Sequence, residues 1–171
     1  MNKSAPTIET KRLILRQLSV DDTADLYRNF ADAEVMKYWQ TRDKTALETR
    51  ARIEAMIAGW QLHGFGDWAV VDKSTSEMIG YCGLHYITDR PEVNLGYLLA
   101  RSSWGKGYAT ETSLLAVRYG FEQVGLRQII GVTAPDNLAS IKVLVKCGMS
   151  HWQDIVRFGQ PRVVYSVGEK S

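Results

Sequence analysis

Two glycines, Gly105 and Gly107, stand in a short polar run between an expected strand and an expected helix. Because they lack a Cβ, they can take left-handed backbone angles, and a ligand can approach the main chain closely there. Consecutive amide N–H groups at such a turn, together with the positive end of the helix dipole, suit an anion such as a pyrophosphate. Gly-x-Gly also fits a plain connecting turn, so this motif alone leaves both readings open.

The turn differs from two well-known nucleotide-binding loops. Thr110 occupies the place of the third glycine of a dinucleotide motif, and the turn comes late in the chain, after several strands. No Gly-Lys-Ser/Thr follows a four-residue gap, so a Walker A loop is excluded.

A second group of residues lies downstream on one face of an expected helix. Asn137, Ser140, Ile141 and Leu144 are spaced i, i+3, i+4 and i+7. A polar pair that continues into an aliphatic stripe suits a ligand with one polar and one apolar end.

The elements that position these residues follow from hydrophobic periodicity and turn signals. We predict a helix that starts at residues 19–22, and further helices at 44–62, 108–124 and 138–146. We predict strands at residues 10–18, 67–71, 78–87, 92–99, 127–132, 155–158 and 162–167. Short polar turns join the strands at 67–99 into an antiparallel meander. A chain of 171 residues suits one domain, so we expect a single α+β domain over residues 1–171.

Composition argues against several classes of protein. The formal net charge is +2 with scattered basic residues, so we expect no nucleic-acid partner. No apolar run approaches a membrane span and the start lacks a signal-peptide core, so we expect no membrane partner and a cytoplasmic location. The 2 cysteines are too few for a disulfide scaffold. His63, His85 and His151 stand apart from one another and from the cysteines, so we expect no metal.

Four segments in the right order resemble the GNAT superfamily of acetyl-CoA-dependent N-acetyltransferases, and more narrowly its RimJ/RimL-like branch. The matching segments are residues 10–16 (TKRLILR), 95–98 (LGYL), 104–111 (WGKGYATE) and 137–149, which ends in Lys-Cys-Gly-Met. The resemblance covers nearly the whole chain. It implies a central mixed, mostly antiparallel sheet with helices on both faces and a gap where the fourth and fifth strands splay apart.

The resemblance implies that acetyl-CoA lies in this gap as the acetyl donor. Main-chain groups near Leu98 would pair with the pantetheine arm, and the amides of the glycine turn would wrap the pyrophosphate. Ser102 stands where the family often has Gln or Arg, so backbone donors would supply most of the anion grip. The implied coenzyme-binding residues are Leu98, Leu99, Ala100, Trp104, Gly105, Lys106, Gly107, Tyr108, Ala109, Asn137 and Ser140.

The residue that protonates the leaving thiolate departs from the common family pattern. Many relatives have a tyrosine seven residues after the asparagine, but here that residue is Leu144, which has no proton to give. The RimJ/RimL-like branch has a serine that matches Ser140. Ser140 is therefore a candidate acid, and an equally simple reading is a serine that bonds local backbone near a helix start.

Two residues are candidates for the general base that removes a proton from the amine. The family often has glutamate two residues before the glycine of the fourth strand, but here that residue is Asn94, which cannot accept a proton. Glu92 lies two positions earlier and could act through water. His85 on the neighbouring strand is the other candidate, with a suitable pKa range. Either residue could instead be a surface acid or a packed histidine.

The resemblance implies an enzyme that moves an acetyl group to a primary amine, either a peptide N-terminus or a small molecule. Homodimers are common among relatives. The departures at Leu144 and Asn94 leave an alternative, a regulatory module that binds acyl-CoA with little or no turnover. Four aromatic residues could line the acceptor mouth, or fill the core: Tyr38, Trp39, Trp68 and Tyr86.

Overall fold

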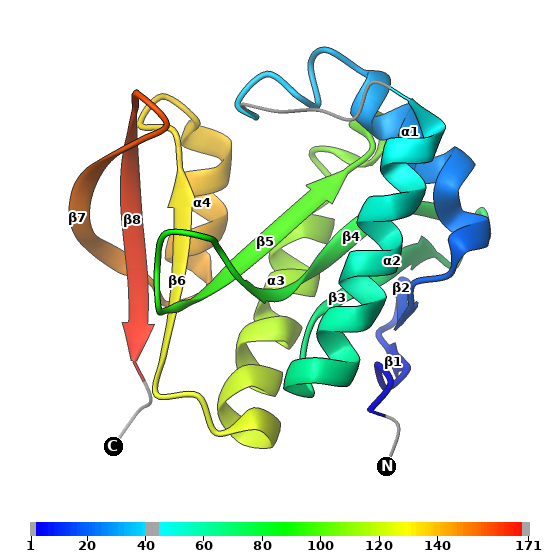
Figure 1. The fold of residues 1–171 in the computed structure, drawn as a ribbon, viewed down its shortest axis with the longest axis horizontal. Helices are drawn as coiled ribbons and strands as arrows, with labels where there is room; N and C mark the ends of the chain where they lie inside the picture. Colours follow the sequence, from blue (N-terminus) through cyan, green and yellow to red (C-terminus); the bar gives the residue numbers. More distant parts are fainter. Residues whose placement is uncertain (1–2, 40–44, 169–171) are drawn as a thin grey trace.

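The computed structural model describes residues 3–39 and 45–168. Its strands form one eight-stranded sheet in the order β1-β2-β3-β4-β5-β6-β8-β7 (Figure 1). The antiparallel meander predicted at residues 67–99 is confirmed as β3–β4–β5. The strands are β1 (Ile8–Glu9), β2 (Leu13–Gln17), β3 (Asp67–Asp72), β4 (Glu77–Tyr86), β5 (Val93–Leu99), β6 (Gln128–Thr133), β7 (Ser150–Arg157) and β8 (Gln160–Gly168).

The helices begin and end at the residues that sequence chemistry favours. Thr45 and Glu48 form a reciprocal capping box at the start of α2, and Gly64 ends it with a left-handed φ of 77°. Asn137 caps α4 by accepting a hydrogen bond from the Ser140 amide. The helical elements are η1 (Val20–Asp22), α1 (Thr23–Ala31), α2 (Ala46–His63), η2 (Arg101–Ser103), α3 (Tyr108–Tyr119), the π-helical turn η3 (Gly120–Val124) and α4 (Leu138–Lys146).

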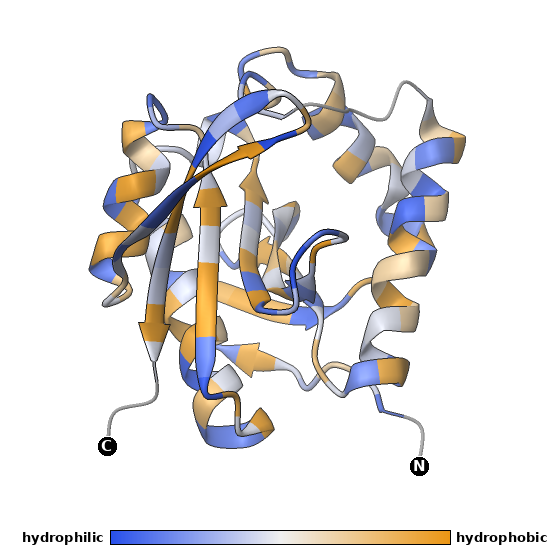
Figure 2. Ribbon diagram, turned by 60° about the vertical axis from the view of Figure 1, so that its left-hand side comes forward, coloured by the Kyte–Doolittle hydropathy of each residue, from blue (hydrophilic) through white to orange (hydrophobic). Residues whose placement is uncertain are grey.

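Helices cover both faces of the sheet, as expected. On one face, α1 and α2 place Leu26, Phe30 and Ile53 against Ala69 and Tyr81 of the sheet. On the other face, α3 contributes Ala116 and Val117 to a core with residues of β2 to β6 such as Leu84, Leu95 and Ile129, and Trp60 of α2 joins this core as well. Consecutive residues of β3, such as Trp68 and Ala69, belong to opposite cores. Bands of hydrophobic residues run along the strands of the sheet (Figure 2).

The splay between the fourth and fifth predicted strands is confirmed. These strands are β5 and β6, which run parallel and pair only at Val93↔Ile129 and Asn94↔Ile130. Beyond Asn94, β5 continues to Leu99 beside β4, while β6 continues to Thr133 beside β8 (Figure 1). A parallel pair needs a crossover, which α3 supplies. The sheet is therefore continuous at one end of these two strands and open at the other.

Several predicted boundaries differ from the structure. The final hairpin starts at Ser150 and not at 155, because β7 is an edge strand whose mostly exposed side chains show no clear apolar alternation. The helix predicted to 124 is α-helical only to Tyr119 and ends in the π-helical turn η3. Lys44, the predicted start of α2, lies outside the described residues. Among the helices that the structure describes, none is long and apolar enough to span a bilayer.

The contact between α4 and β6 yields a stability prediction. A Cβ added at Gly131 would lie 2.4 Å from Leu144 Cδ2, so Gly131→Ala should push α4 away from the strand and cost about 1–3 kcal/mol of unfolding free energy. A Cβ added at Gly59, inside α2, would have no heavy atom within 4 Å, so Gly59→Ala should stabilise by about 0.5–1 kcal/mol. Chemical denaturation of both variants checks this, and equal effects would contradict the packing at Gly131.

Candidate functional site

The glycine turn presents backbone amides for which the described residues provide no acceptor. Gly105 and Gly107 take left-handed φ angles of 73° and 79°, as a turn that redirects consecutive N–H groups requires. In the part of the chain that the structure describes, the amides of Gly105, Lys106 and Gly107 donate no backbone hydrogen bond, and α3 has no side-chain cap. The first turn of α3 adds further amides without intrahelical partners. Amides arranged in this way at a helix N-terminus suit an anion.

Arg12 fastens this turn to the rest of the sheet. Its Nη1 donates to the Lys106 carbonyl at 2.8 Å, and its Nε donates to Glu111 Oε2 at 2.9 Å. The guanidinium also lies 4.6 Å from the centre of the Tyr108 ring. Arg12 thereby holds the turn and the first turn of α3 from the side of β2, with its donors directed at a carbonyl and a carboxylate.

Tyr108 anchors the start of α3 to Asp72, the last residue of β3. Its hydroxyl donates to Asp72 Oδ2 at 3.0 Å, and its ring is buried in the core. Hydrogen bonds from the Ser74 hydroxyl and amide, with the one from Tyr108, hold the pKa of Asp72 below its usual range. The charged Asp72 therefore serves as a fixed acceptor for Tyr108. The expected contribution of Tyr108 to an anion site is confined to its main chain.

The end of β5 offers fewer free groups than the resemblance implied. The Ala100 amide donates to the Ile79 carbonyl at 2.7 Å, and Trp104 Nε1 donates to the Leu99 carbonyl at 2.9 Å. The Ala100 amide is therefore already satisfied within the chain. The side chains of Leu98 and Leu99 are buried in opposite cores, so only their main chain can face the gap.

At the opening between β5 and β6, two hydroxyl groups meet on the face covered by α3 and α4. Ser140 Oγ lies 2.8 Å from the Tyr97 hydroxyl, and the Asn137 side chain is used as the cap of α4. Leu144, which stands where many family members have a tyrosine, is buried against Gly131 and serves to pack α4 on β6. Burial raises the pKa of Tyr97, while its bond to Ser140 opposes that shift. Sequence reasoning missed Tyr97, although it lies in the strand segment that matches the family.

On the opposite face, His85 and Asn94 meet beside the same opening. His85 Nδ1 lies 3.1 Å from Asp67 Oδ1, and its Nε2 lies 3.3 Å from Asn94 Nδ2. Asn94 Oδ1 accepts a hydrogen bond from the Val132 amide at 3.2 Å. The Asn94 side chain therefore bridges to β6 two residues beyond the last backbone pair. Asp67 was not among the predicted site residues. The sequence signal that could have found it is a carboxylate at the start of the otherwise apolar strand predicted at 67–71.

Glu92, the other candidate base, is held in an ion pair. Arg90 Nε and Nη2 donate to its two carboxylate oxygens at 3.0 and 3.1 Å. Glu92 precedes β5, and the structure pairs it with an arginine of the same turn. Glu92 and His85 are thus placed in different surroundings, with His85 nearer the bridge at Asn94.

The four aromatic candidates do not form one surface. Trp68 is fully buried, donates to the Pro6 carbonyl and packs against Trp60, so its prediction as an acceptor contact is wrong. The apolar run of β3 did not reveal which of its residues face a core. Tyr86 is exposed and packs against His63 and Phe65. Trp39 is exposed, and the Tyr38 hydroxyl donates to the Asp136 carbonyl, which ties the segment after α1 to the start of α4.

Comparison with known proteins identifies the family. The acetyltransferase (GNAT) domain matches residues 12–150. The chain belongs to the GNAT acetyltransferase family. This membership classes it as an acetyltransferase enzyme and confirms the resemblance found in the sequence.

Individual relatives agree with this family. The chain is 34% identical over 140 residues to an uncharacterized N-acetyltransferase, p20, of Bacillus licheniformis, covering 81% of this chain and 79% of that protein. It is 32% identical over 164 residues to the FsC-acetyl coenzyme A-N(2)-transacetylase of Aspergillus fumigatus, covering 87% and 67%. A solved structure of RimL, a ribosomal alpha-N-protein acetyltransferase in complex with coenzyme A, shares the fold with a TM-score of 0.79 at 18% identity, covering 95% and 98%.

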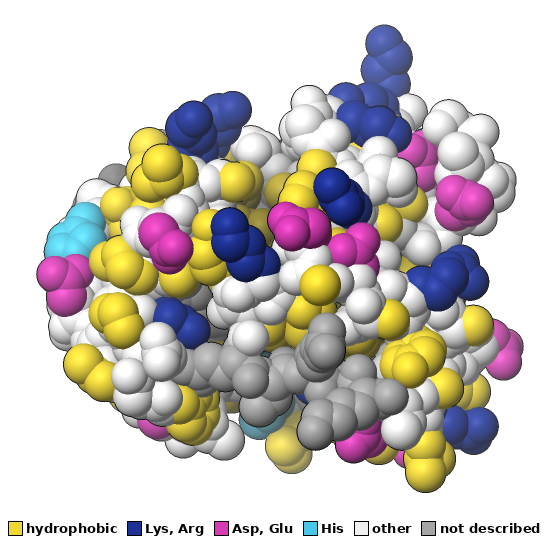
Figure 3. All heavy atoms as spheres, turned by 90° about the horizontal axis from the view of Figure 1, so that it is seen from above, with side chains coloured by type: hydrophobic (Ala, Val, Ile, Leu, Met, Phe, Trp, Pro, Cys, Tyr) yellow, Lys and Arg dark blue, Asp and Glu magenta, His cyan; other side chains and the backbone are white. Residues whose placement is uncertain are grey.

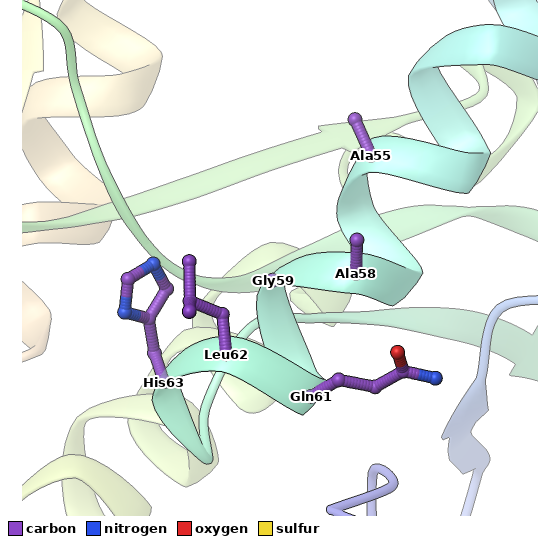
Figure 4. Close-up of a pocket in the computed structure, with 6 residues that line it drawn as sticks. All are labelled: Ala55, Ala58, Gly59, Gln61, Leu62 and His63. Carbon is purple, nitrogen blue, oxygen red and sulfur yellow. The ribbon is translucent and has the colours of Figure 1, made fainter.

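Other surfaces of this GNAT domain include an open hollow along α2. The hollow is lined by alanine, glycine and leucine with Gln61 and His63 (Figure 4). It contains none of the predicted site residues. Among the described residues there is no group of three or more metal-ligating side chains. Acidic and basic side chains are interspersed on the face seen in Figure 3.

The fastening of the glycine turn yields a binding prediction. Arg12→Gln should weaken acetyl-CoA binding by about fivefold, because a half-exposed ion pair that orders the loop contributes about 1 kcal/mol. Isothermal titration calorimetry measures the affinity. Arg28→Gln is the matched control, since Arg28 forms a surface ion pair with Asp25 on α1. Equal affinities of both variants and the native protein would show that Arg12 does not order the turn.

Proposed function

We propose that this protein transfers the acetyl group of acetyl-CoA to a primary amine by direct attack, without a metal. The acceptor is a peptide N-terminus or a small-molecule amine. The observation that carries the proposal is the row of amides at Gly105, Lys106 and Gly107, which have no acceptor among residues 3–39 and 45–168, beside the gap where β5 and β6 part. Coenzyme A in the RimL complex and acetyl coenzyme A in the name of the fungal relative support the same donor.

The chain offers the donor two kinds of contact. The amides of residues 105–109, at and just before the N-terminus of α3, suit the pyrophosphate, with Lys106 and Arg101 adding exposed positive charge. The Trp104 amide, also predicted to bind there, already donates to the Arg101 carbonyl at 3.1 Å. The main chain of β5 beyond Asn94 has no strand partner on its β6 side, which suits the extended amide-containing pantetheine arm. An N–H of this stretch near Leu98 or Leu99 is the expected donor to the developing oxyanion.

The two faces of the gap suit the two halves of the reaction. The Ser140 and Tyr97 hydroxyls lie on the face of α3 and α4 and would stabilise the leaving sulfur by hydrogen bonding. His85 lies on the opposite face, beside Asn94, where the amine would approach. An alkyl amine has a pKa near 10.4, so at pH 7 it must lose a proton before or during attack. Glu92 remains the alternative base.

Acceptor contacts belong to the face that carries His85. Tyr38 and Trp39 are the remaining aromatic candidates for it, since Trp68 is buried and Tyr86, which follows His85 in β4, lies on the opposite face against Phe65. The buried thiols of Cys82 and Cys147 are free, which fits the cytoplasmic location that we propose. A homodimer, as is common among relatives, is part of the same proposal.

A coenzyme-binding module with little or no turnover is the second candidate. Leu144 and Asn94 replace the usual acid and base of the family, and Leu144 is fully packed. A thiol-release assay with acetyl-CoA, a panel of peptides that differ at the N-terminal residue and a set of alkyl amines separates the two. Release with at least one acceptor supports the enzyme. Tight coenzyme binding without release from any of them would favour the module.

A bulky substitution in the glycine turn tests the proposed contact between its amides and acetyl-CoA. Gly107→Val should reduce acetyl-CoA affinity at least about 100-fold, because a branched side chain crowds the amides and opposes the φ of 79°. Calorimetry measures the affinity and circular dichroism checks the fold. Gly159→Val is the matched control, since Gly159 has a φ of 72° in the β7–β8 turn with no heavy atom within 4 Å of an added Cβ. Unchanged affinity in the folded Gly107→Val variant would contradict the site.

A further inference from the structure

A chain of hydrogen bonds crosses four strands on the face where the acceptor would approach. It starts at Asp67 on β3, passes through His85 on β4 and Asn94 on β5, and ends at the Val132 amide of β6. Asp67 and Asn94 are buried, whereas the His85 side chain keeps 33% of its surface exposed. Of the side chains in this series of hydrogen bonds, the imidazole of His85 is therefore the one that an incoming amine can reach.

The sheet makes room for this chain at two glycines. A Cβ added at Gly83 would lie 2.8 Å from Asp67 Oδ1, and one added at Gly96 would lie 2.4 Å from His85 Cε1. Gly83 and Gly96 face each other across β4 and β5. The imidazole thus lies over Gly96 with Cε1 closest to it, two residues along β5 from the last pair with β6, where the gap begins.

The direction of the hydrogen bonds fixes the tautomer of His85. The Val132 N–H can only donate, so Asn94 presents its carbonyl oxygen to β6 and its NH₂ group to His85 Nε2. Nε2 then accepts, and Nδ1 carries the proton that it donates to Asp67 Oδ1. The neutral imidazole therefore holds its lone pair on the nitrogen beside the gap.

We infer that His85 is the general base of the transfer reaction, with Asp67 and Asn94 as the residues that position it. This inference rests on the proposed function. As the amine nitrogen bonds to the acetyl carbon, one N–H proton passes to Nε2 and displaces the long contact from Asn94. The C–S bond breaks, its electron pair leaves with the sulfur, and solvent takes the proton from His85 and protonates the thiolate. An amide and a thiol result.

The charges around His85 favour this role. Burial of the imidazole disfavours its cation, but the Asp67 carboxylate outweighs that penalty and raises the pKa of His85 above its ordinary value. Arg157 of β7 opposes the shift and is itself paired with Asp89. The candidate Glu92, in contrast, has both carboxylate oxygens engaged in an ion pair with Nε and Nη2 of Arg90.

Steady-state kinetics with the best acceptor of the thiol-release panel test the role of His85. His85→Gln should lower kcat/KM by about 100-fold or more, the usual range for a lost general base, with acetyl-CoA affinity unchanged. His151→Gln is the matched control, because it removes a surface His–Asp pair on β7 with a 2.7 Å contact. Added imidazole should restore part of the activity of His85→Ala and should not raise that of the native protein.

The pH profile tests Asp67. The base must be neutral, so kcat/KM rises as pH passes upward through the pKa of His85. Asp67→Asn removes the charge that raises this pKa, so the rising limb should move to lower pH and the plateau should fall. Because the acceptor is the same in both profiles, its own titration cannot cause the shift. A limb that stays in place would overturn the role of Asp67.

Nitrogen NMR of the histidines provides a readout that needs no acceptor. In the native protein, neutral His85 should carry its proton on Nδ1, and Asp67→Asn should lower the pKa of His85. Protonation at Nε2, or equal pKa values in both proteins, would overturn the inference. Full activity of His85→Gln would also overturn it while leaving the proposed function intact. A native protein that binds acetyl-CoA but acetylates nothing would refute the proposed function, and the inference with it.

Discussion

The parting of β5 from β6 is the constraint on which the rest of the structure depends. Two parallel strands that separate after two residue pairs leave main-chain N–H and C=O groups of both strands facing an opening. Such groups need partners, and a ligand with its own amides can provide them. The side chain of Asn94 secures the point of separation by accepting the Val132 amide, so the two strands stay joined at one end and open at the other.

Both faces of this opening are built from residues held by packing or by hydrogen bonds. On one face, α4 rests on β6 through Leu144 and Gly131, which places Ser140 within hydrogen-bond distance of Tyr97. On the other face, His85 is held between Asp67 and Asn94. The glycine turn follows the end of β5 through η2, and Arg12, the residue before β2, holds it by donating to the Lys106 carbonyl. The sites proposed for the pyrophosphate, the leaving sulfur and the incoming amine therefore lie close together around the opening between β5 and β6.

Local signals predicted the parts of the fold that depend on neighbours in sequence. The helix at 138–146 was predicted with its observed bounds, because Asn137 caps it and Gly148 follows it with a left-handed φ of 83°. The edge strand β7 was predicted too short, since pairing with β8 holds it rather than an apolar face. The family resemblance supplied the splay, which periodicity alone does not contain.

Contacts between distant residues could not be predicted in the same way. Asp67 meets His85 only because β3 and β4 pair with Asp67 opposite Gly83 and with a register shift between Val70 and Val71. Tyr97 meets Ser140 only because α4 packs across the opening. Trp68 was misplaced because a continuous apolar strand does not reveal that both of its faces are covered. Each of these depends on strand register or helix packing, which no local motif encodes.

Amide hydrogen exchange resolved by residue tests the central claim most directly, in the native protein with and without acetyl-CoA. The amides of Gly105, Lys106 and Gly107 have no acceptor among the described residues, so they should exchange rapidly alone and become strongly protected when acetyl-CoA binds. The Ala100 amide already donates to Ile79 and should change little. Binding of acetyl-CoA that leaves exchange at these three amides unchanged would contradict the account.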